Sequence, residues 1–523
     1  MTDQPGNPGE TGADVLCDTL LANDVDVCFA NPGTSEMHFV AALDRKPAMR
    51  CVLGLFEGVV SGAADGYARM AGKPAATLLH TGPGMANAMA NMHNARRANT
   101  PMVNVVGDHA SYHLPYDAAL TSDIDTLARP MSGHVRRIAG VEDVSPATAE
   151  SVAAAMSAPG TVSTLILPAN FAWGAAPQGA PAKAQLRAPT RVDDARLEAA
   201  ANALRDGKKT LILMTGTALR EAPLEDAHRI AAATGSDLLA QQANARLERG
   251  GSRVALNRVP YPIDQALEVL KVYERVILVG AKAPVGFFAY PGKPSSLLPE
   301  GCEVLTLADP SDDLPGALDA LAQAVGAKPV PKPQIAAIPD LASGKLTPET
   351  IAITVGHHLP ENAIVCDESV TSGRDFFRFT YGAASHDWLQ LTGGAIGVGL
   401  PLATGAAIAC PDRKVVALQA DGSGMYTNQA LWTMARENLD VCIVIFANRR
   451  YAILHGELKG VGAGEAGENA RRMLDFDEPS LDWVKIAGGM GVEAARAETA
   501  EGFSELFKRA AKTRGPFLIE AMI

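Results

Sequence analysis

Short apolar runs alternate along the whole chain with longer stretches in which polar and apolar residues are mixed. The runs are rich in β-branched residues, which is typical of strands buried on both faces of a sheet. They stand at 26–30, 75–79, 101–107, 162–168, 210–216, 275–280, 303–309, 363–368, 414–421, 441–448 and 516–523. The stretches between them have the pattern of amphipathic helices. Strands that alternate with helices predict parallel sheets covered by helices on both faces.

Two proline-rich stretches, residues 173–191 and 326–340, interrupt this alternation. Such stretches cannot continue a helix or a central strand, so both are expected to be linkers. A chain of 523 residues is also too long for one ordinary core. We therefore predict three doubly wound parallel-sheet α/β domains, at 1–180, 190–328 and 342–523. Open sheets of this kind bind ligands beyond the carboxyl ends of their strands.

The composition restricts the class of partner. A net charge of −12 without any run of basic residues argues against nucleic acid. The N-terminus lacks a basic region followed by an apolar one, and no stretch approaches about 18 apolar residues, so neither export nor a membrane span is expected. The seven cysteines are scattered without a Cys-x-x-Cys pair, which indicates a reducing compartment and no zinc site. We expect a cytoplasmic protein that binds a small molecule.

The last predicted domain carries a pattern that fits phosphate and metal binding. A strand leads into Asp421-Gly422-Ser423, a helical stretch follows, and the next strand ends at Asn448, 27 positions after Asp421. An acidic turn at a helix start can hold a phosphate-bound Mg²⁺, Asn448 can add an amide oxygen, and Gly422 lets the backbone approach closely. The alternative is that Asp421 caps the helix and Asn448 closes a turn. The spacing and the strand-helix-strand context favour the metal site.

This pattern resembles the signature of thiamine diphosphate enzymes, from which it departs at Ala420, where the family has a Gly. The resemblance implies thiamine diphosphate and Mg²⁺ as cofactors, with the metal on Asp421, Asn448 and the carbonyl of Arg450. The three domains would then be a pyrimidine-binding, a middle and a diphosphate-binding domain. The other cofactor contacts that it implies are Thr371 and Ser423 at the diphosphate, the Gly394 carbonyl at the pyrimidine 4′-amino group, Ile396 as an apolar prop, Gly422 and Tyr451. For the segment around Gly394, a glycine-rich loop that merely enters a helix is the alternative.

Glu57 is a single carboxylate within the run of apolar and small residues at 51–69. Ionising it there without a partner would cost several kcal/mol. In the resembling enzymes an acid at this place hydrogen-bonds N1′ of the pyrimidine, which then removes the proton from C2 of the thiazolium, and a dry site that raises its pKa suits this role. The alternative is a helix N-terminal Glu favoured by the macrodipole. The resemblance also implies a homodimer or homotetramer in which Glu57 serves the cofactor held by Asp421 of another chain.

Within the family the sequence is most similar to benzoylformate decarboxylase. The segment 30–43 resembles a substrate-binding loop of that enzyme, with Thr34 in the place of a Ser. The segment 78–107 has His80 in the place of a catalytic His. A His that lines the cofactor cleft can move protons near neutral pH. The alternatives are a purely structural His80 and a Thr34 that only caps the following helix.

The sequence also departs from that enzyme. Ala289 stands where a second catalytic His is expected in the middle domain. A loop after a strand of the first domain carries His109, His113 and Tyr116, and we take His113 as the candidate replacement acid or base; solvated loop histidines are the alternative. Glu457 stands where a benzoylformate enzyme has an aromatic pocket wall. These differences favour a more polar substrate than benzoylformate.

The expected function is that of a thiamine diphosphate- and magnesium-dependent lyase that decarboxylates a 2-oxo acid. The resemblance implies a route through a C2 carbanion and an enamine intermediate, with release of an aldehyde. The first alternative is an acetolactate synthase-like carboligase, which transfers the enamine to a second carbonyl and forms an acyloin or acetohydroxy acid. The second is a cofactor-binding protein with little turnover, which the departures at Ala420 and Ala289 would allow.

Overall fold

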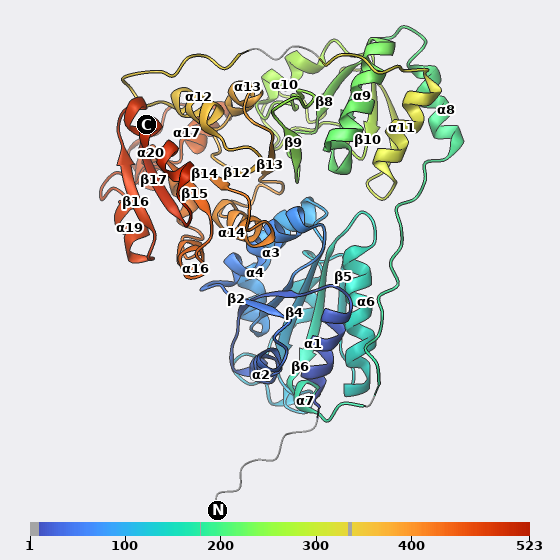
Figure 1. Ribbon diagram of the computed structural model, residues 1–523, viewed down its shortest axis with the longest axis vertical. Helices are drawn as coiled ribbons and strands as arrows, with labels where there is room; N and C mark the ends of the chain where they lie inside the picture. The colour runs from blue at the N-terminus through green and yellow to red at the C-terminus, as the bar shows by residue number, and fades with distance from the viewer. Residues whose placement is uncertain (1–9, 178, 333–336) are drawn as a thin grey trace, which may run out of the picture.

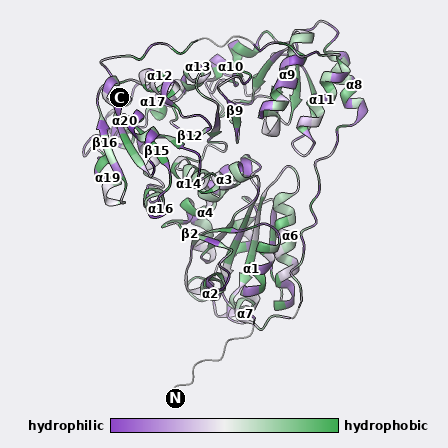
Figure 2. Cartoon of the chain, viewed as in Figure 1, coloured by the Kyte–Doolittle hydropathy of each residue, from purple (hydrophilic) through white to green (hydrophobic). Residues whose placement is uncertain are grey.

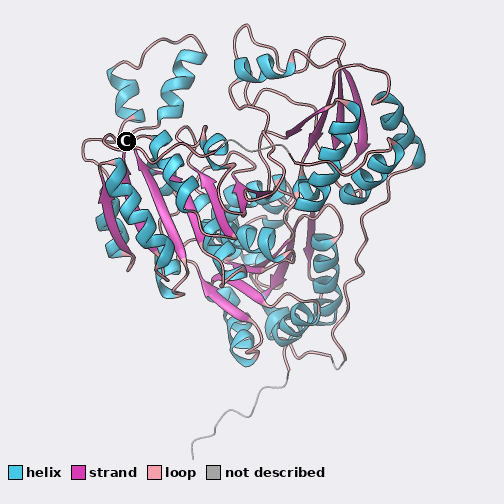
Figure 3. Ribbon diagram, turned by 45° about the horizontal axis from the view of Figure 1, so that its top comes forward, coloured by secondary structure: helices cyan, strands magenta, loops and turns pink. Residues whose placement is uncertain are grey.

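The computed structural model describes residues 10–177, 179–332 and 337–523, and its strands form three separate sheets (Figure 1). Residues 1–9, together with residue 178 and residues 333–336 of the two predicted linkers, lie outside the described residues. Helices surround each sheet, as Figure 3 shows with strands in magenta and helices in cyan. The predicted fold class, α/β with three parallel sheets, is therefore confirmed.

The first sheet contains six parallel strands in the order β2-β1-β3-β4-β6-β5. Its strands are β1 (Val27–Asn31), β2 (Arg50–Leu53), β3 (Ala76–Leu79), β4 (Met102–Asp108), β5 (His134–Arg137) and β6 (Val162–Pro168). Its helices are α1 (Gly12–Ala22), α2 (Met37–Arg45), α3 (Glu57–Ala71), α4 (Thr81–Arg97), α5 (Ile124–Ala128), α6 (Val144–Met156) and α7 (Ala169–Trp173). Short 3₁₀ turns are η1 (Thr34–Glu36), η2 (Leu114–Tyr116) and η3 (Val141–Asp143).

The second sheet contains four parallel strands in the order β11-β10-β7-β8. Its strands are β7 (Thr210–Met214), β8 (Asp237–Ala240), β10 (Arg275–Val279) and β11 (Glu303–Ala308). Its helices are α8 (Asp194–Ala203), α9 (Glu221–Thr234), α10 (Ile263–Leu270) and α11 (Leu314–Ala324), with the 3₁₀ turn η4 (Gly216–Leu219).

The third sheet contains seven strands in the order β16-β17-β15-β14-β12-β13-β9. They are β9 (Leu247–Arg249), β12 (Ala363–Glu368), β13 (His386–Gln390), β14 (Val415–Ala420), β15 (Val441–Ala447), β16 (Glu493–Ala497) and β17 (Phe517–Met522). Its helices are α12 (Pro348–His358), α13 (Phe376–Thr380), α14 (Gly399–Ala409), α15 (Asp421–Gly424), α16 (Ala430–Arg436), α17 (Ala452–Gly460), α18 (Glu468–Leu474), α19 (Trp483–Gly489) and α20 (Ala500–Lys512). β9 is supplied by the middle part of the chain and pairs antiparallel with β13.

The central strands are buried on both faces, which explains their apolar sequences. Every residue of β4, β6, β7 and β15 is buried. In Figure 2 the strands are largely green, whereas the helices carry purple residues as well. None of the helices in the described part of the chain has both the length and the apolar character needed to cross a membrane.

Helices α3 and α14 bring the first and third sheets into direct contact. A Cβ atom at Gly66 would lie 2.0 Å from the carbonyl oxygen of Leu402, and one at Gly405 would lie 1.8 Å from that of Ala63. Any larger side chain at either position would force the two helices apart. The small residues of both helices are thus required for close backbone contact.

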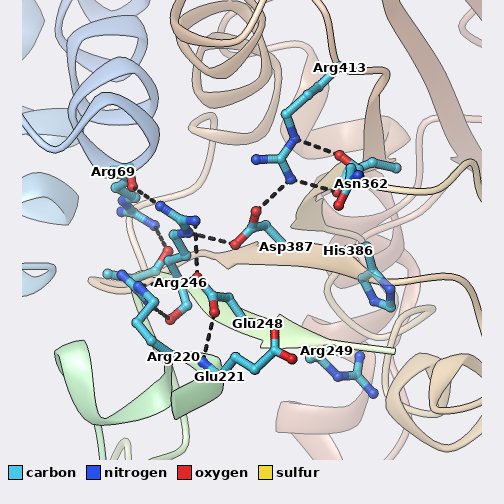
Figure 4. Close-up of polar contacts among 12 residues, drawn as sticks. Arg69, Arg220, Glu221, Arg246, Glu248, Arg249, Asn362, His386, Asp387 and Arg413 are labelled. Atoms are coloured by element: carbon cyan, nitrogen blue, oxygen red, sulfur yellow. Dashed lines mark hydrogen bonds and ion pairs between the residues drawn. The ribbon is translucent and has the colours of Figure 1, made fainter. Parts of the chain in front are cut away.

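A partly buried ionic cluster joins all three parts of the chain (Figure 4). Asp387 of β13 accepts hydrogen bonds from Arg246 (2.6 Å) and Arg413 (2.5 Å). Arg246 also pairs with Glu248 (3.2 Å) and donates to the carbonyl of Arg69 in α3 (3.4 Å). Because Asp387 is buried, it depends on these two arginines for its counter-charge, and loss of both would leave an unpaired buried charge, which is strongly destabilising.

His386, at the start of β13 beside this cluster, is fully buried. Its Nδ1 donates to the carbonyl of Ala384 (2.7 Å), and its Nε2 has no hydrogen-bond partner among the described residues. Burial and the nearby Arg249 lower the pKa of His386 to about 3. The folded protein therefore keeps this ring neutral, while the unfolded chain takes up a proton below its ordinary value of 6.5.

We expect His386 to make the protein less stable as the pH falls below 6.5. Between pH 6.5 and 5.0 it should lower the free energy of unfolding by about 2 kcal/mol, at about 1.4 kcal/mol per pH unit. Urea unfolding at both values should show this extra loss in the unaltered protein and not in His386→Phe. The exposed His357→Phe serves as the control and should keep the slope of the unaltered protein. Equal slopes for the unaltered protein and His386→Phe would contradict the prediction.

Candidate active site

The carboxyl ends of the neighbouring strands β12, β14 and β15 meet at one edge of the third sheet. The loops after them carry Thr371, Asp421 and Asn448, so the topology gathers the residues that the sequence selected. Two of these loops also contain a non-glycine residue in the left-handed region, Val370 (φ 52°) and Arg449 (φ 60°). For a β-branched residue such as Val370 this conformation is strained, and strain of this kind clusters at functional sites.

Asp421 is buried and pairs with no cationic side chain in the described part of the chain. Its two oxygens accept the N–H groups of Gly422 (2.9 Å) and Arg449 (2.7 Å). Burial raises the pKa of Asp421 to about 6, although these hydrogen bonds lower it. Asp421 is the first residue of α15, and the capping position belongs to Ala420, so the simple capping interpretation does not hold. A buried carboxylate without a counter-charge fits a metal ligand.

Asn448 and Arg450 lie next to Asp421 because the N–H of Arg449 binds its carboxylate. Asn448 Oδ1 accepts the N–H of Arg450 (3.1 Å), and the carbonyl of Arg450 accepts the N–H of Ala452 (3.0 Å). Asn448 therefore does close a turn, and both oxygens retain a lone pair. No cluster of three or more His, Cys, Asp and Glu side chains suited to a metal occurs among the described residues. One carboxylate, one amide and one carbonyl form instead the all-oxygen donor set that suits Mg²⁺.

The surroundings of Ser423 and Gly422 are held by buried polar contacts. Gln419 donates to Ser423 Oγ (2.6 Å) and to Glu368 (3.0 Å). A Cβ atom at Gly422 would lie 2.5 Å from the ring of Tyr451, so glycine is required there. Tyr451 is thus fixed against the acidic turn, beside the residues selected for the diphosphate.

The glycine-rich loop before α14 lies at the same edge of the sheet. Glu368, at the end of β12, accepts the N–H groups of Gly397 (2.6 Å) and Gly399 (2.8 Å), and burial raises its pKa. Gly394 has φ 79°, and a Cβ atom there would lie 2.5 Å from the ring of Phe287. Gly394 is exposed and Ile396 is half-buried. The loop thus presents both residues at the surface of the third domain, next to an aromatic ring of the middle domain.

Glu57 is the first residue of α3 and is 7 % exposed. Its Oε2 accepts a hydrogen bond from Asn87 of α4 (3.0 Å). A Cβ atom at Gly84 would lie 2.9 Å from Glu57 Oε1 and 3.3 Å from His80 Cβ. Gly84 therefore lets the carboxyl group and His80 approach one another at the start of α4.

His80 is held by a second acid, Glu36. Nδ1 of His80 lies 2.8 Å from Glu36 Oε2 and 3.2 Å from Ser35 Oγ. Glu36 is buried and also accepts the N–H of Gly33 (2.8 Å). The carboxylate makes Nδ1 the protonated nitrogen and leaves Nε2 free for chemistry. Thr34 lies exposed in η1, directly before this pair.

His113 belongs to a loop that starts close to Glu36, since a Cβ atom at Gly107 would lie 1.9 Å from Glu36 Oε1. It is exposed in the loop after β4, with its ring centroid 5.6 Å from that of His109 and 5.8 Å from that of Tyr116. No hydrogen bond or ion pair between described residues joins His113 to Glu57 or His80. The structure thus groups Glu57 with His80 and leaves His113 on an outward-facing loop.

No described contact joins the Glu57 and His80 group to Asp421 or Asn448 within one chain. Glu57 and His80 on the first domain, and Asp421 and Asn448 on the third, therefore form two groups that no described contact joins directly. Sequence reasoning missed Glu36, Asn87, Glu368 and Gln419, which hold the members of these groups in place. The spacing of Glu36 three residues after Gly33, typical of a capping arrangement, was the one available signal.

A cavity of about 220 Å³ lies between the middle domain and α17. Thr371, Phe287 and Glu457 are among the residues that line it. Tyr290 donates to Glu457 Oε2 (2.6 Å), which together with burial raises the pKa of Tyr290. Glu457 and Thr371 therefore line the same cavity.

Comparisons with known proteins agree with this geometry. Residues 10–128 match the family described as thiamine pyrophosphate enzyme, N-terminal TPP binding domain, and residues 372–521 match its C-terminal TPP binding domain. The chain is 50 % identical over 513 residues to a Mycobacterium tuberculosis protein provisionally named acetolactate synthase large subunit IlvX, covering 98 % of this chain and 99 % of that protein.

Two decarboxylases are more distant relatives. Benzoylformate decarboxylase of Pseudomonas aeruginosa is 28 % identical, with 96 % of each chain covered. The solved structure of the thiamine diphosphate-dependent 4-hydroxybenzoylformate decarboxylase of Rhodococcus jostii RHA1 is similar with a TM-score of 0.86 at 25 % identity, and 98 % of each chain is covered. The chain belongs to the thiamine pyrophosphate enzyme family, whose members among its relatives are decarboxylases and acetolactate synthases.

Proposed function

We propose that this protein is a thiamine diphosphate- and Mg²⁺-dependent decarboxylase of a polar 2-oxo acid. The observation that carries the proposal is the buried Asp421, which pairs with no cationic side chain among residues 10–177, 179–332 and 337–523 and is placed beside Asn448 and the carbonyl of Arg450. These three groups would hold Mg²⁺. Thr371, Ser423 and the backbone at Gly422 would contact the diphosphate, and Tyr451 would line its site.

The bound cofactor would supply a nucleophilic carbon and an electron sink for the loss of carbon dioxide. Glu57 would hold a proton at N1′ of the pyrimidine, and Asn87 orients its carboxyl group. The carbonyl of Gly394 would accept the 4′-amino group, and Ile396 would support the bent cofactor from its apolar side. His80, oriented by Glu36, would move a proton at the substrate through Nε2, and Thr34 would contact the substrate.

The separation of the two groups supports active sites between subunits. Within one chain α3 packs directly on α14, which leaves no space for a pyrimidine ring between these helices. We therefore propose a homodimer or homotetramer in which Glu57 of one chain serves the cofactor held by Asp421 of the next. In this arrangement the exposed His113 would lie at the subunit boundary as a second acid or base. The seven free cysteines support a cytoplasmic setting.

The carboxylate of Glu457 in the lining of the cavity supports a polar substrate. Glu457→Phe removes a hydrogen-bond acceptor from the cavity and adds an aromatic wall. We expect it to raise the preference for benzoylformate over 4-hydroxybenzoylformate by about tenfold. The variant can no longer accept a hydrogen bond from the 4-hydroxyl group, so the hydroxylated compound loses affinity relative to benzoylformate. The two compounds are compared as substrates or, where turnover is slow, as competitive inhibitors. Glu468→Phe, exposed on α18, is the control, and an unchanged preference in Glu457→Phe would contradict the assignment.

One specific observation favours the alternative hypothesis that the protein is a carboligase. The chain is 50 % identical to the protein provisionally named acetolactate synthase large subunit. The same residues would activate the cofactor in both reactions, so the difference lies in the second acceptor. Product analysis with pyruvate alone, and with pyruvate and an added aldehyde or 2-oxobutyrate, separates the two. Free aldehyde supports the decarboxylase, and acetolactate or an acyloin as the main product supports the carboligase.

The purified protein with thiamine diphosphate and Mg²⁺ is expected to release carbon dioxide from at least one member of a panel of 2-oxo acids. The panel includes pyruvate, 2-oxobutyrate, 2-oxoglutarate, benzoylformate and its 4-hydroxy derivative. Omission of Mg²⁺ from metal-stripped protein should abolish the release. No release from any member, with the cofactor shown to be bound, would favour the non-catalytic cofactor-binding protein and overturn the proposal.

A further inference from the structure

The loop at residues 392–397 belongs to the third domain, but it also contacts α4 of the first domain in the same chain. Asn94 Nδ2 donates to the carbonyl of Ala395 (2.7 Å), and Asn94 Oδ1 accepts the N–H groups of Gly393 and Ala395 (3.2 Å each). His93 Nε2 lies 3.1 Å from the carbonyl oxygen of Gly393. Asn94 is fully buried, so these hydrogen bonds form away from water.

A second buried asparagine one turn earlier extends this contact. Asn91 Nδ2 donates to the carbonyl of Gly397 (3.3 Å) and to that of Gly58, the residue after Glu57 (2.8 Å). Asn94 Nδ2 also donates to Asn91 Oδ1 (3.1 Å), which links the two side chains. Positions 91 and 94 share one face of α4, since residues three apart on a helix are neighbours.

Every second carbonyl group of the loop accepts a hydrogen bond. Those of Gly393, Ala395 and Gly397 accept hydrogen bonds, whereas those of Gly394 and Ile396 have no partner among the described residues. Gly394 has a left-handed backbone conformation. Glycine has more backbone freedom than any other residue type, so this peptide is not held in one direction by its own side chain. The Gly394 carbonyl and the Ala395 N–H belong to one planar peptide group, so the hydrogen bond from that N–H to Asn94 Oδ1 fixes the direction of the carbonyl. Asn94 Oδ1 also holds the N–H of Gly393, just before this group.

We propose that Asn94, supported by Asn91, is a positioning residue that aims the Gly394 carbonyl at the 4′-amino group of the bound cofactor. This inference rests on the proposed function, which assigns the Gly394 carbonyl to that group. A pre-aimed acceptor costs no reorganisation when the cofactor binds. The acceptor for the pyrimidine thus belongs to the third domain, while its direction is set by a helix of the first domain.

The test compares two ligands that differ only at the group in question. Dissociation constants of thiamine diphosphate and of its 4′-deamino analogue are measured by calorimetry at saturating Mg²⁺ on the full-length protein. The unaltered protein should prefer thiamine diphosphate by about tenfold, the value of one well-formed hydrogen bond. In Asn94→Ala the preference should fall to about twofold, because the acceptor is no longer aimed.

Asn244→Ala is the matched control. Asn244 is also a buried amide at a domain boundary, where its N–H and Nδ2 donate to Gln390 Oε1 (3.0 and 3.3 Å), and it does not touch the loop. It should keep the tenfold preference, since general loosening of the structure weakens both ligands alike. Should Asn94→Ala fail to fold by circular dichroism, Asn94→Ser is held to the same criterion.

Three results would overturn the inference: a preference that stays near tenfold in the Asn94 variant, an equal fall in Asn244→Ala, or no preference in the unaltered protein. Failure of the proposed function has a different signature. In that case Mg²⁺ does not tighten the binding of thiamine diphosphate to the unaltered protein. The Asp421→Ala variant then binds the cofactor as tightly as the unaltered protein does.

Discussion

Glu57→Gln is expected to slow hydrogen exchange at C2 of bound thiamine diphosphate by about 10²- to 10³-fold, the range of a positioned acid–base group. Glutamine has the same shape and can still accept the hydrogen bond from Asn87, so the packing at the start of α3 should persist. It cannot hold or release the proton at N1′. The affinity for the cofactor should change by about threefold or less, since the residues selected to hold the metal and diphosphate lie elsewhere.

Exchange is measured by NMR after mixing the loaded protein with deuterium oxide, and affinity by calorimetry. Glu520→Gln is the control, because Glu520 is also a buried carboxylate, paired with Arg496 (2.9 Å), but it lies on β17 of the third sheet and not in the first domain. It should exchange at the rate of the unaltered protein. An exchange rate in Glu57→Gln that matches the unaltered protein would remove the role assigned to Glu57.

Asp421→Ala is expected to weaken Mg²⁺-dependent binding of thiamine diphosphate by more than about 100-fold, beyond the usual effect of residues that merely support a ligand. Asp421 is the only carboxylate in the proposed donor set, and an amide with a carbonyl cannot by themselves compensate the charge of Mg²⁺. The variant should fold, because the carboxylate that burial disfavours is replaced by a small apolar group.

Binding of the cofactor is titrated with and without Mg²⁺ in the unaltered protein, in Asp421→Ala and in Asp482→Ala. Asp482 caps α19 by accepting the N–H of Lys485, so its loss removes an ordinary helix cap of about 1 kcal/mol and no metal ligand. The control should bind the cofactor normally. Persistence of full Mg²⁺ dependence in Asp421→Ala would show that Asp421 serves only the local backbone.

Most central strands could be predicted from the sequence because burial on both faces favours continuous apolar runs. The buried strand β13, with the sequence HDWLQ, escaped prediction because polar residues interrupt its apolar pattern. Strands such as β5, with the sequence HVRR, and β16, with EAARA, escaped prediction, since they are edge strands whose residues are largely half-buried or exposed. β9 could not be foreseen either. Three residues carry no periodic signal, and their place beside β13 depends on the tertiary packing of Arg246 and Arg249.

The members of the site were selected from spacing and resemblance, and the structure groups them at two sheets as the parallel topology requires. The residues that hold these members in place could not be predicted from the sequence. Glu36 and His80 are 44 positions apart, and Asn94 lies about 300 positions from the loop that it binds, so no local pattern connects them. In the proposed assembly, the pairing of the two groups into one site depends on contacts between chains, for which no local pattern of the sequence gives a signal.

The short strand β9 also changes what counts as a removable unit in this chain. A fragment that starts at residue 342 would contain the whole proposed metal site, yet it would leave β13 as an uncovered, hydrogen-bonding edge and Asp387 without Arg246. Exchange of diphosphate-binding domains between relatives would meet the same obstacle unless residues 244–249 travel with them. The segment belongs to the middle domain by its place in the sequence and to the third domain by its strand pairing with β13. Any cut between these two domains therefore divides a single sheet.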